Sequence, residues 1–234
     1  MTVFYVISKY ATVFGTLIKG LWEHIVCGIL KLFVEDARYL EPTEICGHVE
    51  HELPQNRAKA FLICFLPGIL NAVLAFFLGG AGFMGLFVLG VQKNTAVFWI
   101  YLVLYYLGIS FFCNIFPLVE DAMNNWSRLY HSGLTEEDKA RNEEIKKRQL
   151  ANKAFEKEAE KIAKEKAKEK KGSAPVKIKK NSEGSEQIKT DTNIIAKIIL
   201  FIPSAIAYAG AYLEKYCVTF IISIIVTVLA IVLA

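Results

Sequence analysis

Apolar and charged residues occupy separate stretches of this 234-residue chain. Residues 60–91 contain one polar side chain, Asn71, and residues 96–119 carry no formal charge. Each stretch exceeds the roughly 20 residues that an α-helix needs to cross the ~30 Å hydrocarbon layer of a bilayer. Because backbone polar groups find no water inside that layer, both stretches are predicted to be membrane-spanning helices.

Three further apolar stretches lie at the two ends of the chain. Residues 217–234 carry no charge and predict a helix, whereas residues 194–213 contain Lys197 and Pro203. This interruption leaves a tilted span and a half-inserted, re-entrant segment both open. Residues 1–34 are apolar with scattered charges and lack the order of features typical of a signal peptide. We expect a permanent helix there, with its polar groups on an inner stripe or at the interface.

A hydrophilic insertion over residues 120–193 holds 18 Lys or Arg and 15 Asp or Glu. Thr135, followed three places on by Asp138, is typical of a helix start, and the Ala-, Glu- and Lys-rich sequence predicts a helix as far as Lys171. The segment after Lys171 has the composition of a disordered linker. Lys and Arg near the membrane at both ends of the insertion indicate that it is cytoplasmic. The helix is either simply solvated or an arm that binds a protein partner or lipid headgroups.

The expected fold class is therefore an all-α polytopic membrane protein with about 4–6 membrane helices and a cytoplasmic charged helical insertion. The expected segments are an N-terminal membrane or interfacial helix (1–34), a polar connecting segment (35–59), membrane core helices (60–130), the cytoplasmic charged helix and disordered linker (131–193) and a C-terminal membrane hairpin (194–234). Whether the polar segments on either side of the apolar stretches can form one site depends on the number of spans in residues 60–91. If residues 60–91 form one span rather than a hairpin broken at residues 79–82, the segments before and after the core lie on the same side and can meet.

The composition argues against several kinds of binding site. The five cysteines are scattered without CxxC spacing, which indicates small apolar fillers rather than disulfides or a four-cysteine zinc site. The glycine-rich residues 79–85 lie in an apolar run without Lys, so helix packing or a membrane turn is favoured over phosphate binding. The net charge of +4 is better explained by lipid headgroups than by nucleic acid.

Two of the four histidines lie in the polar stretch CGHVEHELPQ, residues 46–55. Its HELPQ part invites comparison with the zinc motif HExxH, in which two His four apart bind the metal and Glu activates water. Gln55 replaces the second His, and Pro54 disfavours a helical turn at that point. The segment is therefore predicted to be extended or a turn.

The elements that follow carry further polar residues within apolar sequence. Pro67 and Asn71 lie in one predicted helix, and Asn114, Pro117 and Asp121 lie at the end of a later one. This order resembles the site-2 protease class of intramembrane zinc metalloproteases, most closely its compact microbial branch. The resemblance covers roughly residues 15–130, and the hydrophilic insertion and the C-terminal apolar pair lie outside it.

The resemblance implies that the zinc-binding helix is the N-terminal one, with Glu23 at the position of the catalytic base and Asp121 as a metal ligand. Trp22 and Val26 then stand where the two ligand His belong, and neither can bind a metal. The metal-binding motif is thus degenerate. A rearranged zinc site remains an alternative, with ligands drawn from His24, His48, His51 and Asp121.

The expected function is that of a membrane scaffold or binding module that resembles a site-2-type protease and does not catalyse hydrolysis. Its partners would be the lipid bilayer and a membrane or cytoplasmic protein that binds residues 135–190, and no cofactor is expected. One alternative is an active, zinc-dependent intramembrane peptidase with the rearranged ligand set. A transporter or channel component is another, although few charged residues lie within the spans and no repeat is evident.

Overall fold

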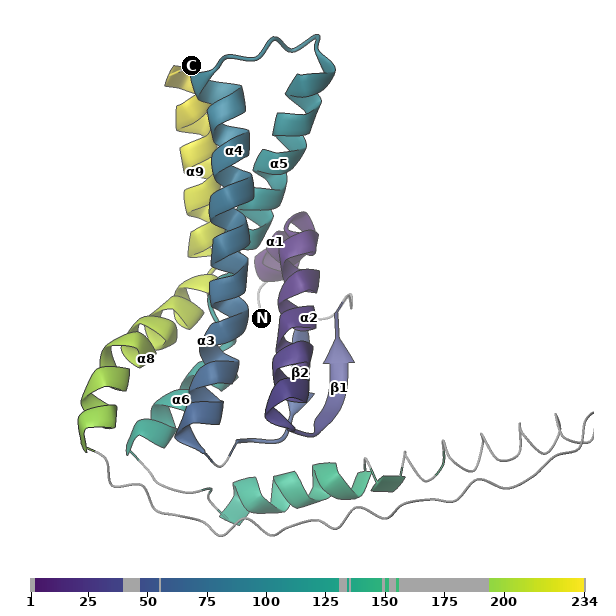
Figure 1. Ribbon diagram of the computed structural model, residues 1–234, viewed down its shortest axis with the longest axis vertical. Coiled ribbons are helices and arrows are strands. Elements are labelled where there is room, and N and C mark those ends of the chain that lie inside the picture. The colour runs from purple at the N-terminus through teal and green to yellow at the C-terminus, as the bar shows by residue number, and fades with distance from the viewer. Residues whose placement is uncertain are drawn as a thin grey trace, which may run out of the picture.

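The computed structural model of the protein is mostly helical (Figure 1). It describes residues 3–39, 47–54, 56–130, 134, 136–148, 150–151, 155 and 194–233. Within this part of the chain, three helices are long and apolar enough to cross a membrane: Val13–Leu30, Arg57–Val88 and Ile198–Lys215. Two shorter apolar helices accompany them. The predicted cap at Thr135, most of the predicted helix beyond residue 151 and the predicted linker lie outside the described residues.

Residues 57–88 form one continuous helical column. It consists of α3 (Arg57–Leu74), the π-helical η1 (Ala75–Gly79), α4 (Gly80–Phe83) and the π-helical η2 (Met84–Val88). The column holds 32 residues and is about 48 Å long at 1.5 Å per residue. Of the two alternatives left open for residues 60–91, the structure therefore shows one continuous helix, and the hairpin broken at residues 79–82 is wrong.

The helix α5 (Ala96–Phe112) returns beside this column (Figure 1). Two glycines allow its backbone to approach its neighbours closely. A Cβ on Gly108 would lie 2.1 Å from the Cα of Gly79 in the column, and a Cβ on Gly15 would lie 1.9 Å from the carbonyl oxygen of Ser110 in α5. Small residues thus set the helix crossings, as is common in membrane bundles.

The N-terminal stretch, predicted as one helix, is two. The helix α1 (Val3–Ala11) and the helix α2 (Val13–Leu30) are separated at Thr12, which has non-helical backbone angles. The polar groups on the inner side, as predicted, are Lys9, Lys19 and Glu23, and each is buried.

A two-stranded antiparallel sheet follows α2, which the all-α prediction omits. Strand β1 (Val34–Arg38) pairs with strand β2 (His48–His51), so the extended conformation predicted for this part of CGHVEHELPQ is confirmed. Alternate residues of a strand face the same side. Val49 and His51 are accordingly both buried against the helices.

Two further helices lie beside the lower end of the column in Figure 1. The helix α6 (Val119–Tyr130) packs against α8 (Ile194–Lys215), and Asn125 Nδ2 donates to Ser204 Oγ across this contact at 2.9 Å. α8 passes Pro203 without a break. The helix α9 (Val218–Leu233) then runs beside the column while α8 slants away from it. The two C-terminal helices therefore meet at an open angle.

Candidate functional site

A first polar cluster lies where α2, β2 and α6 meet. Glu23 comes from α2, His51 from the buried face of β2, and Asp121 from the first turn of α6. His51 Nε2 lies 3.6 Å from Asp121 Oδ1, which is an ion-pair distance. The backbone N–H of Val49 donates to Glu23 Oε2 at 3.3 Å, and the two carboxylates are close enough to interact electrostatically. The polar stretch before residue 60 and Asp121 thus meet, as one continuous helix over residues 60–91 allows.

His51 is the cation of this cluster. Burial lowers the pKa of its imidazole, but the neighbouring Asp121 carboxylate, the Glu52 carbonyl and the charge of Glu23 together raise that pKa to about 9. The Nδ1 atom of His51 lies 2.9 Å from the Glu52 carbonyl oxygen, so protonation of both ring nitrogens satisfies both neighbours. The imidazole is therefore positively charged at neutral pH.

A second cluster lies deeper among the helices and is centred on Glu214 of α8. Glu214 Oε1 is 2.5 Å from Lys9 Nζ and 3.5 Å from Lys19 Nζ, and all three side chains are at most 5% exposed. Glu214 Oε2 accepts the backbone N–H of Phe116 at 3.0 Å, and Lys19 donates to the Phe116 carbonyl oxygen. A buried carboxylate thus ties α1, α2 and α8 to the segment between α5 and α6.

Two buried asparagines connect this cluster to the column. Asn114 Oδ1 accepts from Lys9 Nζ at 2.7 Å and from Thr16 Oγ1 at 3.2 Å. Asn71 Nδ2 donates to the carbonyl oxygens of Gly15 and Asn114, at 3.2 and 3.0 Å. These two residues therefore join α3 to α2 and to the end of α5. Their amides provide polar partners where no bulk water is available.

The two clusters are continuous along α2. Lys19 and Glu23 are four residues apart, on one side of the helix, and interact electrostatically. Together the clusters contain three basic side chains, Lys9, Lys19 and His51, and three acidic ones, Glu23, Asp121 and Glu214. Because an unpaired charge is costly in such surroundings, the close pairs Lys9–Glu214 and His51–Asp121 let charged groups be buried or half-buried here.

The structure does not bring all the predicted metal ligands together. His51 and Asp121 are adjacent, but His24 is exposed on the other side of α2, where its ring stacks on Tyr39 and its Nδ1 bonds to the Tyr39 hydroxyl. The side chain of His48 lies outside the described residues. Among the residues that are described, no group of three His, Cys, Asp or Glu side chains has the arrangement of a metal site.

Trp22 and Val26 occupy apolar surroundings beside the first cluster. Val26 is 2% exposed and packs in an apolar cluster with Cys27 and Ile63. The Nε1 atom of Trp22 is buried and makes no hydrogen bond to a residue that the structure describes. α2 therefore presents Glu23 to the cluster between two side chains that cannot ligate a metal.

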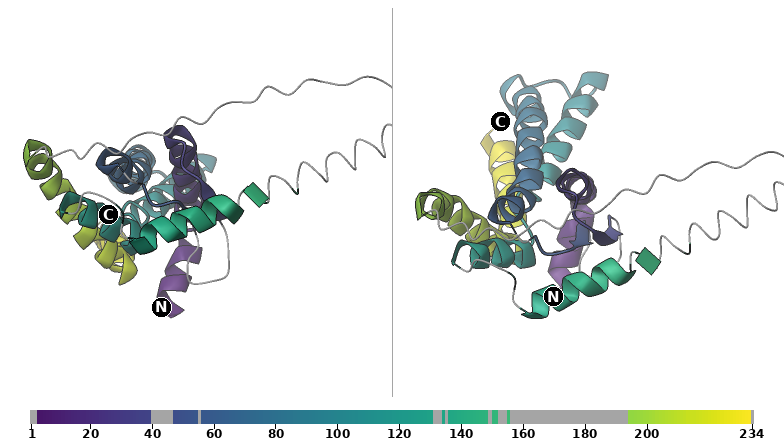
Figure 2. Two further views of the ribbon diagram at one scale, coloured as in Figure 1. Left: turned by 90° about the horizontal axis from the view of Figure 1, so that it is seen from below. Right: turned by 60° about the horizontal axis from the view of Figure 1, so that its bottom comes forward.

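A short helix over residues 136–148 covers the sheet end of the molecule (Figure 2). Asn142 is 4% exposed and forms two hydrogen bonds with the backbone of Leu53, accepting its N–H at 2.8 Å and donating to its carbonyl at 2.9 Å. Ile145 is buried beside it, and Arg148 reaches Glu35 of β1 at 2.6 Å. The predicted arm thus begins with a helix that is attached to the core, which we call the docked helix.

The second cluster is the part of the site that the sequence did not predict. Lys9 and Lys19 belong to the scattered charges of residues 1–34 that were expected on an inner stripe or at the interface, and no role was predicted for Glu214. The spacing of Lys19 and Glu23 was a usable indication, because residues four apart share a helical face. Nothing local indicates that Glu214, about 200 residues away, is their partner.

Comparison of the chain with protein-family models, with curated proteins and with solved structures gives no match.

Proposed function

We propose that this chain is an integral membrane protein with a core built like that of the site-2 proteases and without metal-dependent catalysis. Three helices of spanning length and apolar composition support the membrane location. One observation supports the absence of metal-dependent catalysis. The carboxylate of Asp121, which the resemblance assigns to the metal, is paired with the protein's own His51. A protonated imidazole has no free lone pair, so a metal ion would bind His51 only by displacing its proton and breaking the pair with Asp121.

The role that remains is binding. The docked helix is held by Asn142 and by the ion pair of Arg148 with Glu35, so the chain beyond it leaves the core from a fixed position. We propose that residues 150–190 bind a cytoplasmic protein partner and that the membrane core anchors this arm. Its dense and alternating charges suit electrostatic recognition of such a partner.

Metal analysis of the detergent-purified protein tests the absence of a metal centre. We expect less than stoichiometric zinc, with the same content in the wild type and in Asp121→Ala. About one zinc per chain, lost in both His51→Ala and Asp121→Ala, would overturn the proposal.

Deletion of residues 150–190 tests the arm. Proteins that crosslink to the wild type in cells should no longer crosslink to the deletion variant, while the core keeps its thermal stability. An unchanged set of crosslinked proteins would exclude the arm as the binding element.

An active intramembrane peptidase is the second candidate. The proximity of Glu23, His51 and Asp121 in a buried position favours it, since these residue types serve as general base and ligands in zinc hydrolases. This candidate requires deprotonation of His51 and at least one further ligand, for which the exposed His24 is on the wrong side of α2. Cleavage of a transmembrane reporter that is abolished by both Glu23→Gln and chelators would establish it.

A further inference from the structure

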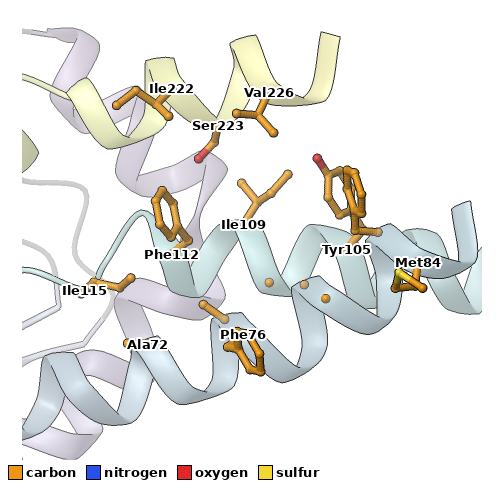
Figure 3. Close-up of a pocket in the computed structure, with 15 residues that line it drawn as sticks. Ala72, Phe76, Met84, Tyr105, Ile109, Phe112, Ile115, Ile222, Ser223 and Val226 are labelled. Carbon is orange, nitrogen blue, oxygen red and sulfur yellow. The ribbon is translucent and has the colours of Figure 1, made fainter. Parts of the chain in front are cut away.

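An apolar cavity of about 610 Å³ lies between α9, α5 and the helical column (Figure 3). Ala72, Phe76 and Gly80 line it from the column, Phe112 from α5, and Ile222 and Val226 from α9. None of its lining residues carries a charge. It is separate from the polar clusters, and the proposed function does not use it.

The polar groups of α9 that face α5 already have partners. Tyr105 OH lies 2.9 Å from Thr227 Oγ1, and Cys113 Sγ lies 3.4 Å from Ser223 Oγ. Ser223 Oγ also donates to the Thr219 carbonyl oxygen at 2.9 Å. These contacts hold α9 against α5 and leave a hydrocarbon surface toward the cavity. Such a cavity does not attract water, because water needs two or more polar partners there.

The size and chemistry of the cavity restrict its occupant. The arm of this chain carries many charges and cannot enter an uncharged cavity without a large desolvation cost. A helix from a second copy would also meet this uncharged lining, and the crosslinking test below distinguishes it from a lipid. A flexible hydrocarbon chain fits both the volume and the lining.

We propose that this cavity binds one acyl chain of a bilayer phospholipid, with the headgroup outside the cavity. The lining offers no cation for a carboxylate, which disfavours a free fatty acid as the occupant. The bound chain would fill the space between α9 and the column and so fix the position of α9. This inference rests on the proposed membrane location and on no property of the polar clusters.

Gly80 provides a direct way to fill the cavity. It lines the cavity, and no atom lies within 4 Å of the position that a Cβ would take. Gly80→Leu should therefore occupy part of the cavity without a backbone clash. Gly28→Leu is the matched control, because Gly28 of α2 is equally unobstructed and lies outside the cavity. Both substitutions also change helix propensity in the same direction. Val226→Trp fills the cavity from α9 and serves as a second variant.

The test uses the full chain in vesicles that contain a phosphatidylcholine with a photoreactive group midway along one acyl chain. We expect crosslinks on Phe76, Met84 and Val226, reduced about tenfold by Gly80→Leu and unchanged by Gly28→Leu, since a buried Leu side chain displaces a comparable part of the lipid chain. Val226→Trp should reduce labelling of Phe76 in the same way.

Equal labelling of the two glycine variants would overturn the proposal. It would also be overturned if a photoreactive free fatty acid labelled these residues and the phospholipid did not, or if the crosslinked species were a second copy of the chain. Alkaline extraction of the membranes separates this failure from that of the proposed function. A chain that is extracted contradicts both, whereas a chain that is retained without labelling contradicts the acyl-chain site alone.

Discussion

His51 Nε2 lies 3.6 Å from Asp121 Oδ1, although the two residues are 70 positions apart in the sequence. The helical column and α5 lie between them along the chain. The contact joins the strand β2 to the first turn of α6. Its negative partner lies at a helix N-terminus, where the helix dipole also favours a carboxylate. This ion pair makes the first cluster sensitive to pH in a defined direction.

The pKa of His51 is raised from 6.5 to about 9 in the folded protein. The pair should therefore stabilise the fold fully below about pH 6.5, and this stabilisation should be lost as the pH rises through about 9. We expect the difference in melting temperature between the wild type and His51→Gln to be large at pH 6.5 and to shrink toward pH 10. Comparison with the variant removes the effect of groups that titrate at high pH without interacting with His51. A difference that grows with pH would contradict the assignment of His51 as the buried cation.

The pairing of Lys9 with Glu214 should dominate the stability of the second cluster. Glu214→Gln removes the carboxylate that both Lys9 and Lys19 contact, and breaking a buried ion pair in this way costs about 3–5 kcal/mol. Thermal unfolding in detergent measures the loss. Glu136→Gln is the control, because its partner Lys139 is on the surface, and it should have no measurable effect. Similar melting temperatures for the two variants would show that the buried pair is not stabilising.

The contact between α2 and α5 should not tolerate a side chain at Gly15. Gly15→Ala would place a Cβ 1.9 Å from the Ser110 carbonyl oxygen, and overpacking of this kind costs about 1–3 kcal/mol or more. Gly28→Ala, in open space on the same helix, should be neutral or slightly stabilising. Yield and melting temperature of the two variants measure the difference. Equal stability would mean that α2 and α5 do not cross at this point.

The docked helix should depend on Asn142. Asn142→Ala leaves the N–H and carbonyl of Leu53 without these partners, at a cost of about 1–3 kcal/mol. Hydrogen exchange over residues 136–148 should become faster, while exchange in α3 stays unchanged. The neighbouring Glu143 is exposed, so Glu143→Ala should leave exchange unaltered. Slow exchange in Asn142→Ala would show that the helix is held by other contacts.

If α2 corresponds to the zinc-binding helix of the site-2 proteases, two substitutions in α2 should introduce metal binding. Trp22→His with Val26→His places two imidazoles four residues apart on the inner face, beside Glu23 and Asp121. We expect stoichiometric zinc in this variant. Leu21→His with Ile25→His has the same spacing on the exposed face and should bind much less, because no carboxylate from α6 is near.

Equal zinc content in the two double variants would contradict the correspondence. Further replacement of Asp121 by Ala should remove the zinc from the inner-face variant. Retention of zinc without Asp121 would likewise contradict it.

The sequence determined the elements whose cause is local or lies in composition. Long apolar stretches predicted helices for the column, α5 and α9, and they left residues 194–213, which form most of α8, open between a tilted span and a re-entrant segment. Gly47 and Pro54 flank β2 and predicted that the histidine stretch is not helical. The break at Thr12 and the pairing of β1 with β2 were not predicted, because each depends on contacts between segments.

Tertiary structure decided which polar groups became a site. The pattern of residues could not distinguish one span from a hairpin over residues 60–91, and only the continuous column puts His51 and Asp121 at the same end. It also could not reveal that Glu214 neutralises Lys9 and Lys19, since ion pairing depends on distance in space and not on separation in sequence. The sequence by itself thus determined which segments are apolar enough to be buried in a membrane. The packing of the helices determined which charges are buried together, because each buried charge requires a partner of opposite sign within a few ångströms.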